Sequence, residues 1–177
     1  MNQGGHQEVQ GETIAKFEFF DHGFNPYSRY LDVDKVDLIL RKKVGNAVAY
    51  REVQVKFGRL YECGPKWEQS LFDVTSWRFF RTDEFRAHRP DLFVAYVLSN
   101  PRTGYQGDIF IFPSQAFHEL IHAAIPVKGG DQRKMYLSRS KTDHTWHLRT
   151  AGRFDAITPQ TTRSVQEFRR NFGVLDQ

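Results

Sequence analysis

The chain has 177 residues, of which 40% are hydrophobic and 26% are charged, and its formal net charge is +4. This composition is typical of one folded domain with a buried core. The polar N-terminus and the lack of an apolar run of about 20 residues argue against a signal peptide and a membrane span. A single cysteine cannot form an internal disulfide, and we expect a cytoplasmic protein without membrane contacts. The positive charge favours an anionic partner, although each single basic cluster is more typical of a solvated surface.

The N-terminal part of the sequence predicts a flexible segment followed by a helix. Residues 1–10 are polar and are expected to be flexible, whereas residues 11–177 are expected to form a single domain. From Gly11 to His22, apolar residues recur at helical spacing, and Gly23 is typical of the residue that ends a helix.

Two neighbouring strands are predicted next. Residues 36–40 and 53–57 are rich in β-branched residues, and the Gly45-Asn46 pair between them is typical of a turn, so the two segments are expected to pair antiparallel. Further strands are predicted over residues 71–80, 92–98, 108–112, 134–137 and 145–148, and helical segments over residues 82–88, 115–124 and 164–171. This order predicts an α/β domain with a central mixed β-sheet flanked by helices.

The strand over residues 52–56 carries unusual polar residues. Residues two apart on a strand face the same side, so Glu52, Gln54 and Lys56 project together while Val53 and Val55 project the other way. Polar groups in an otherwise apolar sheet must be paired, solvated in a cleft or bound to a ligand. This face of the strand is therefore a candidate site.

Asp37 extends this candidate site to the preceding strand. If the two strands pair as a hairpin, the Asp37 carboxylate lies across from Gln54 and Lys56. A carboxylate, an amide oxygen and an ammonium together suit phosphodiester hydrolysis assisted by a hard cation such as Mg²⁺. From spacing alone, a buried Asp–Lys ion pair with the glutamine hydrogen-bonded beside it is an equally good interpretation.

Several short motifs resemble one known family. In order along the chain they are Gly11-Glu12, Ala15-Lys16-Phe17, Gly23-Phe24-Asn25-Pro26-Tyr27, Val36-Asp37-Leu38 and Glu52-Val53-Gln54-Val55-Lys56. This series resembles the PD-(D/E)xK nuclease superfamily, and within it the branch whose second motif reads Gln-Val-Lys. The motifs span residues 11–57, and a looser likeness in the order of elements continues to about residue 124. The resemblance implies a restriction-endonuclease-like core.

The resemblance also implies roles for individual residues. Asp37 would be the metal-binding carboxylate of the first motif, Gln54 would give the metal its amide oxygen, and Lys56 would be the catalytic lysine. The main-chain carbonyl of Val55 would be a further metal ligand. Glu12 matches an acidic residue of the first helix that helps to hold metal or water, but an acid in the first turn of a helix is also favoured by the helix dipole.

The glutamine departs from the commoner pattern of the family. Many members have Glu or Asp where this chain has Gln54, so the metal would be held by fewer negative charges. Glu52, on the same side of the strand, could compensate or could lie exposed at the strand edge. The cofactor implied is Mg²⁺, with Mn²⁺ as the alternative.

The function implied is that of a metal-dependent endonuclease acting on DNA in defence, restriction or branched-DNA processing. RNA is an alternative substrate, and a homodimer is expected by analogy. The alternative function is a catalytically inactive nuclease-fold module that binds nucleic acid or a protein partner. Outside the motifs, Lys66, Arg149 and Arg153 are the candidates for phosphate contacts.

Overall fold

The computed structural model describes residues 3–28, 35–84, 89–128 and 130–176. Along the chain the elements are α1 (Gln3–Asp21), β1 (Asn25–Ser28), β2 (Leu38–Val44), β3 (Ala47–Arg59), β4 (Tyr61–Glu62), α2 (Lys66–Leu71), β5 (Phe72–Arg81), β6 (Leu92–Asn100), β7 (Gly104–Pro113), α3 (Ser114–Ala123), β8 (Ile125–Pro126), β9 (Gln132–Ser140), β10 (Trp146–Arg149), β11 (Thr162–Ser164) and the 3₁₀ helices η1 (Gln166–Phe168) and η2 (Phe172–Asp176). In the described part of the chain no helix is long and apolar enough to cross a bilayer.

The first sheet has the strand order β1-β2-β3-β6-β7 and is mixed, because β3 and β6 run parallel while the other neighbours run antiparallel. The expected α/β domain with a mixed sheet is therefore confirmed. The expected hairpin is also present: β2 pairs with β3 across a turn at which Gly45 adopts φ +59°. The prediction of a strand over residues 92–98 is confirmed as well, since β6 is buried along nearly all of its length.

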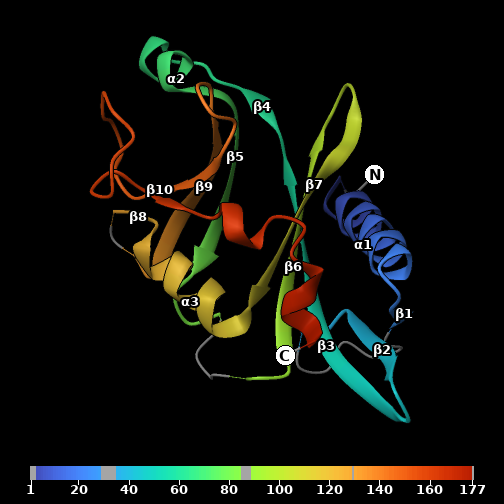
Figure 1. Cartoon of the computed structure of the whole chain (residues 1–177). Coiled ribbons are helices and arrows are strands. Elements are labelled where there is room, and N and C mark those ends of the chain that lie inside the picture. Colours follow the sequence, from blue (N-terminus) through green and yellow to red (C-terminus); the bar gives the residue numbers. More distant parts are fainter. Residues whose placement is uncertain (1–2, 29–34, 85–88, 129, 177) are drawn as a thin grey trace.

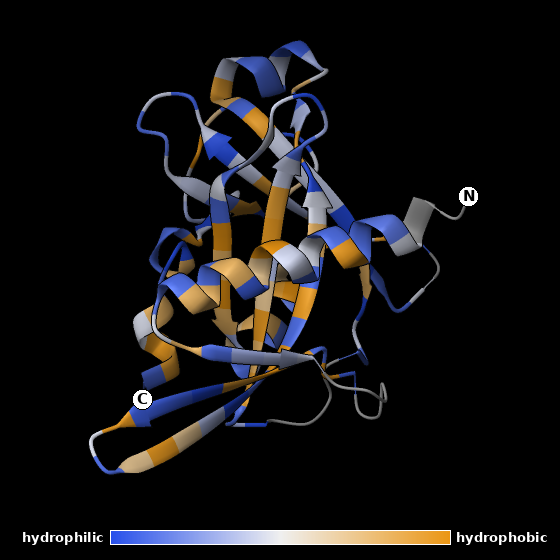
Figure 2. Cartoon of the chain, turned by 90° about the vertical axis from the view of Figure 1, so that its right-hand side faces the viewer, coloured by the Kyte–Doolittle hydropathy of each residue, from blue (hydrophilic) through white to orange (hydrophobic). Residues whose placement is uncertain are grey.

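A second, antiparallel sheet was not predicted. Its strand order is β11-β10-β9-β5-β4, and β8 pairs with β9 beside this path. The first sheet is flanked by helices as expected, since α1 crosses one face and α3 packs on the other, but the second sheet also packs on that other face (Figure 1). Figure 2 shows α1 lying in front of the hydrophobic strands of the first sheet.

Two apolar clusters hold these layers together. Between α1 and the first sheet, the buried residues include Ala15, Phe19, Leu38, Val53, Phe57, Ala95, Val97 and Ile109. Between the two sheets and α3, they include Val94, Tyr96, Phe110, Phe117, Ile121, Met135, Leu137 and Trp146. Alternate residues of β6 therefore face opposite clusters, as the two-residue period of a strand requires.

The N-terminal helix begins earlier than the sequence predicted. Residues 3–10, expected to be flexible, form the first half of α1, and the helix ends as predicted before Gly23, which has φ +82°. Polarity misled the prediction, because this half of α1 leaves most of its side chains exposed. Gly11 explains the close packing of the helix: a Cβ atom there would lie 3.1 Å from the Cβ atom of Phe57 on β3.

The C-terminal segment also differs from the prediction. A helix expected over residues 164–171 is replaced by the end of β11 and by η1, and Arg170 adopts φ +51°, which interrupts helical geometry. The predicted helical segment over residues 82–88 lies partly outside the described residues. α2 was not predicted.

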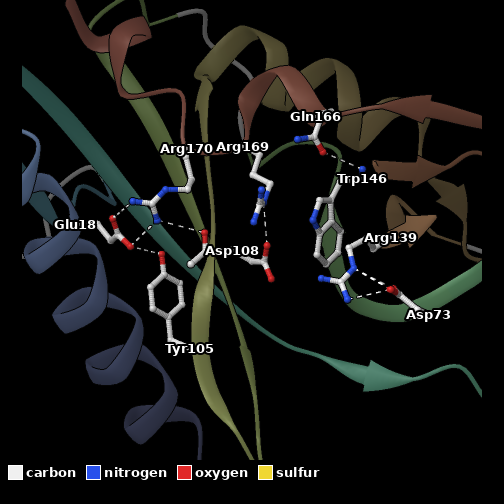
Figure 3. A network of polar contacts seen from close by, with 10 residues as sticks. Glu18, Asp73, Tyr105, Asp108, Arg139, Trp146, Gln166, Arg169 and Arg170 are labelled. Atoms are coloured by element: carbon white, nitrogen blue, oxygen red, sulfur yellow. Dashed lines mark hydrogen bonds and ion pairs between the residues drawn. The ribbon is translucent and has the colours of Figure 1, made fainter. Parts of the chain in front are cut away.

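A polar network fastens the C-terminal segment to the first sheet (Figure 3). Arg170 donates to both carboxylate oxygens of Glu18 on α1, at 2.8 and 2.9 Å, and the Tyr105 hydroxyl donates to the same carboxylate at 2.5 Å. Beside them Arg169 pairs with the buried Asp108 of β7 at 2.9 Å. These contacts join α1, β7 and the chain end, which places η2 against the cluster under α1.

Candidate functional site

The candidate site lies where the edge of β3 becomes accessible. β2 pairs with β3 from Val44 opposite Ala47 to Leu38 opposite Val53, and Asp37 adds one more bond by donating its N–H to the Val53 carbonyl at 3.0 Å. Asp37 thus stands immediately before β2, rather than within a strand as predicted. Beyond this point β3 continues for six residues, and its far edge remains bonded to β6.

The side chain of Asp37 binds the edge of β3 just beyond the last residue that pairs with β2. Its Oδ2 atom accepts a hydrogen bond of 2.6 Å from the main-chain N–H of Val55. In a β-strand the N–H and C=O of one residue point to the same side, so the Val55 carbonyl is directed to the same edge as the Asp37 carboxylate. The local geometry thereby places a carboxylate and a main-chain oxygen side by side.

Gln54 and Lys56 reach the site from one face of β3. Val53 and Val55 pack in the cluster under α1, so the intervening side chains point to the other face, as the sequence predicted. Gln54 is only 6% exposed, and Lys56 donates to Glu84 Oε1 at 3.1 Å. The interpretation as a buried Asp–Lys pair is therefore not what the structure has, since the lysine pairs with Glu84.

Glu12 approaches from α1. The close contact of Gly11 with Phe57 brings this turn of the helix onto β3, and Glu12 lies within 4.0 Å of Lys16, one turn further along. Glu12 stands about two and a half turns into the helix, so the interpretation as a first-turn acid held by the helix dipole no longer applies.

The five residues to which the resemblance assigns roles border one cleft, which encloses about 420 Å³; they are Glu12, Asp37, Gln54, Val55 and Lys56. Its lining consists of Glu8, Glu12, Lys35, Val36, Asp37, Gln54, Val55, Lys56, Phe57, Arg78 and Glu84. The charged groups comprise four carboxylates and three cations, contributed by α1, the residues before β2, β3, β5 and the turn after β5. The cleft is therefore polar and strongly charged.

Comparison with protein-family models, with curated proteins and with solved structures finds no match.

The oxygen atoms around Asp37 suit a hard divalent cation. Mg²⁺ binds carboxylate, amide and carbonyl oxygens and retains several waters. Asp37, Glu12, Gln54 and the Val55 carbonyl, which all line the cleft, would supply such ligands. Within the described residues no three His, Cys, Asp or Glu side chains are grouped to hold a metal, but this ligand set relies on an amide and a main-chain oxygen instead.

Four residues of the cleft were missed by the sequence analysis. Glu84, Arg78, Lys35 and Glu8 belong to no motif, and two of them lie more than twenty residues beyond Lys56. Arg78 is on β5, where it donates to the Phe57 carbonyl at 3.0 Å. It reaches the cleft because β5 packs beside β3, a contact that no local pattern could reveal. For Glu84, an acidic side chain in the turn after β5 is only a weak sequence signal of a site residue.

Glu52 does not take part in the cleft. It forms an ion pair with Arg89, at the start of the paired segment of β3 and β6, and lies among residues of a separate hollow. It therefore does not compensate for the missing charge of Gln54.

The three predicted phosphate contacts lie away from the cleft. Arg149 is 1% exposed, and its guanidinium donates to Glu68 at 2.7 Å, so it joins β10 to α2 instead of facing a ligand. Lys66 begins α2 and is exposed, as is Arg153 in the loop before β11. These two share a region of the surface, because the neighbouring rings of Trp67 and Phe154 are in contact at 5.2 Å.

Proposed function

We propose that this chain is a Mg²⁺-dependent endonuclease that hydrolyses phosphodiester bonds of DNA, with a core of the restriction-endonuclease kind. The observation that carries the proposal is the convergence of Asp37, Gln54, Lys56 and Glu12 on one cleft at the exposed edge of β3. The resemblance of the sequence motifs concerns these same residues, and the pairing of β2 with β3 accounts independently for the meeting of Asp37, Gln54 and Lys56.

The metal would polarise the scissile phosphate and make bound water a better nucleophile. Asp37 is held in place for this role, because one of its oxygens accepts a hydrogen bond from the Val55 N–H. Glu12 and Gln54 would complete the ligand set. The neutral amide of Gln54 makes the site weaker for metal than one with a third carboxylate.

Lys56 would act on the phosphate itself. Its side chain is only 12% exposed and its ammonium is hydrogen-bonded to Glu84, so its position is fixed before the substrate binds. A fixed positive charge beside the phosphorus offsets the negative charge that grows on the phosphoryl oxygens in the transition state. Arg78 and Lys35, on the walls of the same cleft, would bind the flanking phosphates.

A plasmid-nicking assay tests the proposal. Wild-type protein with Mg²⁺ or Mn²⁺ should convert supercoiled DNA to nicked and linear forms, and EDTA should stop the reaction. Asp37→Asn and Lys56→Ala should each lower the rate about 100-fold or more, since each removes a charge that acts at the reacting phosphate. Asp21→Asn and Lys43→Ala are the matched controls, because both side chains are exposed outside the cleft.

Metal binding can be followed without any reaction. Mg²⁺ should raise the melting temperature of the wild type and of Asp21→Asn, but should raise that of Asp37→Asn much less, because a ligand that binds only the folded state stabilises it. Gln54→Glu should bind the metal more tightly than the wild type. Equal stabilisation of wild type and Asp37→Asn would place the metal elsewhere.

The neutrality of Gln54 favours one other function, that of a nuclease-like module that binds nucleic acid without cutting it. In that case the wild type would bind DNA but leave the plasmid intact at every metal concentration. Gln54→Glu would then be the informative variant, since it restores the charge found in other branches of the family.

A further inference from the structure

Aromatic side chains gather on the outer face of the second sheet, beside the cleft. Tyr61 on β4 and Trp77 and Phe79 on β5 are 40%, 41% and 45% exposed. Trp77 lies opposite Tyr136 of β9, and Phe79 lies opposite Lys134. We call this set, with Tyr136 and Lys134, the aromatic track.

The track faces outward because of strand alternation. On β5 and β9, Phe80, Met135 and Leu137 point to the opposite face and are buried in the cluster between the sheets. The side chains of the aromatic track are therefore not part of the apolar core between the sheets. A contiguous group of large exposed aromatic side chains is typical of a binding surface.

The rings are arranged side by side and carry a cation among them. The ring of Trp77 lies 6.5 Å from that of Tyr61 at an interplanar angle of 24°, and 5.6 Å from that of Phe79. The Lys134 ammonium lies 4.4 Å from the centre of the Trp77 ring and 4.8 Å from that of Tyr136. Ring faces with a positive charge between them suit a ligand that is both planar and anionic.

The aromatic track leads into the cleft. A hollow of about 230 Å³ is lined by Gln7, Glu8, Phe57, Gly58, Arg59, Tyr61, Trp77 and Arg78. Three of these residues, Glu8, Phe57 and Arg78, also line the cleft with Lys56. Arg59 adds an exposed positive charge at the end of β3. A chain lying on the track would therefore pass two guanidinium groups before it reached Lys56.

We infer that the aromatic track binds a single-stranded nucleic acid and guides it into the cleft, so that the substrate is a strand with unpaired bases. The inference rests on the proposed function for the cleavage step. Bases of a duplex are stacked on each other and offer no face to a protein ring, whereas unpaired bases stack on exposed aromatic side chains whatever their sequence. A base on Trp77 would displace the Lys134 ammonium, which then pairs with the adjacent phosphate.

Binding to a labelled oligothymidylate, longer than the roughly 16 nucleotides that one such surface covers, tests this inference. Fluorescence anisotropy is measured on the full chain in EDTA, so that no cleavage occurs. Wild type should bind the single strand more tightly than a duplex of the same length. Trp77→Ala and Phe79→Ala should each weaken binding about tenfold or more. Phe17→Ala is the matched control, because Phe17 is 67% exposed on α1, outside the track.

Two further measurements keep the test independent of folding. Lys134→Ala should weaken binding at low salt and reduce its dependence on salt, because one phosphate contact is lost, whereas Lys128→Ala should have no effect. Oligothymidylate should quench tryptophan fluorescence in the wild type, and Trp77→Phe should lose most of this quench while it retains binding.

The results separate the two proposals. If Trp77→Ala binds the oligonucleotide as tightly as Phe17→Ala, or if the duplex binds as tightly as the single strand, the inference is wrong even where plasmid is cut. If the track variants lose binding but wild type cuts no DNA in Mg²⁺, the inference stands and the endonuclease proposal fails.

Discussion

Replacement of Arg149 tests whether this arginine is structural. Its guanidinium donates to Glu68 at 2.7 Å, to the Ser138 hydroxyl at 2.8 Å and to the Thr75 hydroxyl at 3.2 Å, and it lies 4.8 Å from the centre of the Tyr136 ring. Both side chains of the ion pair are nearly inaccessible to solvent. Arg149→Met removes one partner and leaves the Glu68 carboxylate buried without its cation, which costs about 3–5 kcal/mol of unfolding free energy.

Urea unfolding followed by circular dichroism measures this loss. With a slope of about 2 kcal/mol per molar urea, the midpoint of Arg149→Met should fall by about 2 M. Arg153→Met, the exposed control, should unfold at the wild-type midpoint. The double variant Arg149→Met/Glu68→Leu should recover most of the loss, because an apolar pair leaves no charge unpaired. A wild-type midpoint for Arg149→Met would refute the structural role and return Arg149 to the candidates for phosphate binding.

Three other predictions follow from the fold. Burial raises the pKa of Glu18, but hydrogen bonds from Arg170 and Tyr105 outweigh this effect and lower the pKa below 4.5. The stability that ionised Glu18 contributes is therefore present above about pH 4.5 and is lost as the pH falls below it. In urea titrations, the difference in unfolding free energy between wild type and Glu18→Gln should shrink as the pH falls through that range. Gly58→Ala should cost about 1–3 kcal/mol in thermal unfolding, because a Cβ atom would lie 2.7 Å from Leu98 Cδ2 and from Ser76 Oγ, whereas Gly64→Ala, with open space around it, should be neutral. Burial, followed by the charge of Glu68, raises the pKa of Cys63 to about 11, so its thiol should react with a disulfide reagent far more slowly in the native protein at pH 7.5 than in urea.

The parts of the site that the sequence predicted are those set by local rules. Strand alternation placed Gln54 and Lys56 on one face, and the Gly45-Asn46 turn brought Asp37 beside them. Glu12 required the family resemblance, because its distance from β3 depends on how α1 packs.

Long-range packing decided the rest. Glu84 and Arg78 enter the cleft only because the second sheet packs beside β3, and no local pattern in the later strands indicates that they join into one sheet. Arg149 was misjudged for the same reason. It follows Leu148 in a short strand and points to the face opposite the core, where an exposed side chain is the usual outcome. Glu68 of α2 and the ring of Tyr136 enclose it instead.

The dependence of the site on α1 has a physical consequence for the proposed metal centre. With a neutral amide at Gln54, the negative charge of the proposed ligands would come from Asp37, which is fixed to β3 by a hydrogen bond, and from Glu12, which belongs to a separate helix. The separation of the two carboxylates is therefore set by the packing of α1 on β3, at the contact between Gly11 and Phe57. A larger side chain at Gly11 would require either Phe57 or α1 to shift, and a shift of α1 would change the distance between Glu12 and Asp37. The glycine thus belongs to the proposed site through its packing, although it has no group that could bind a metal.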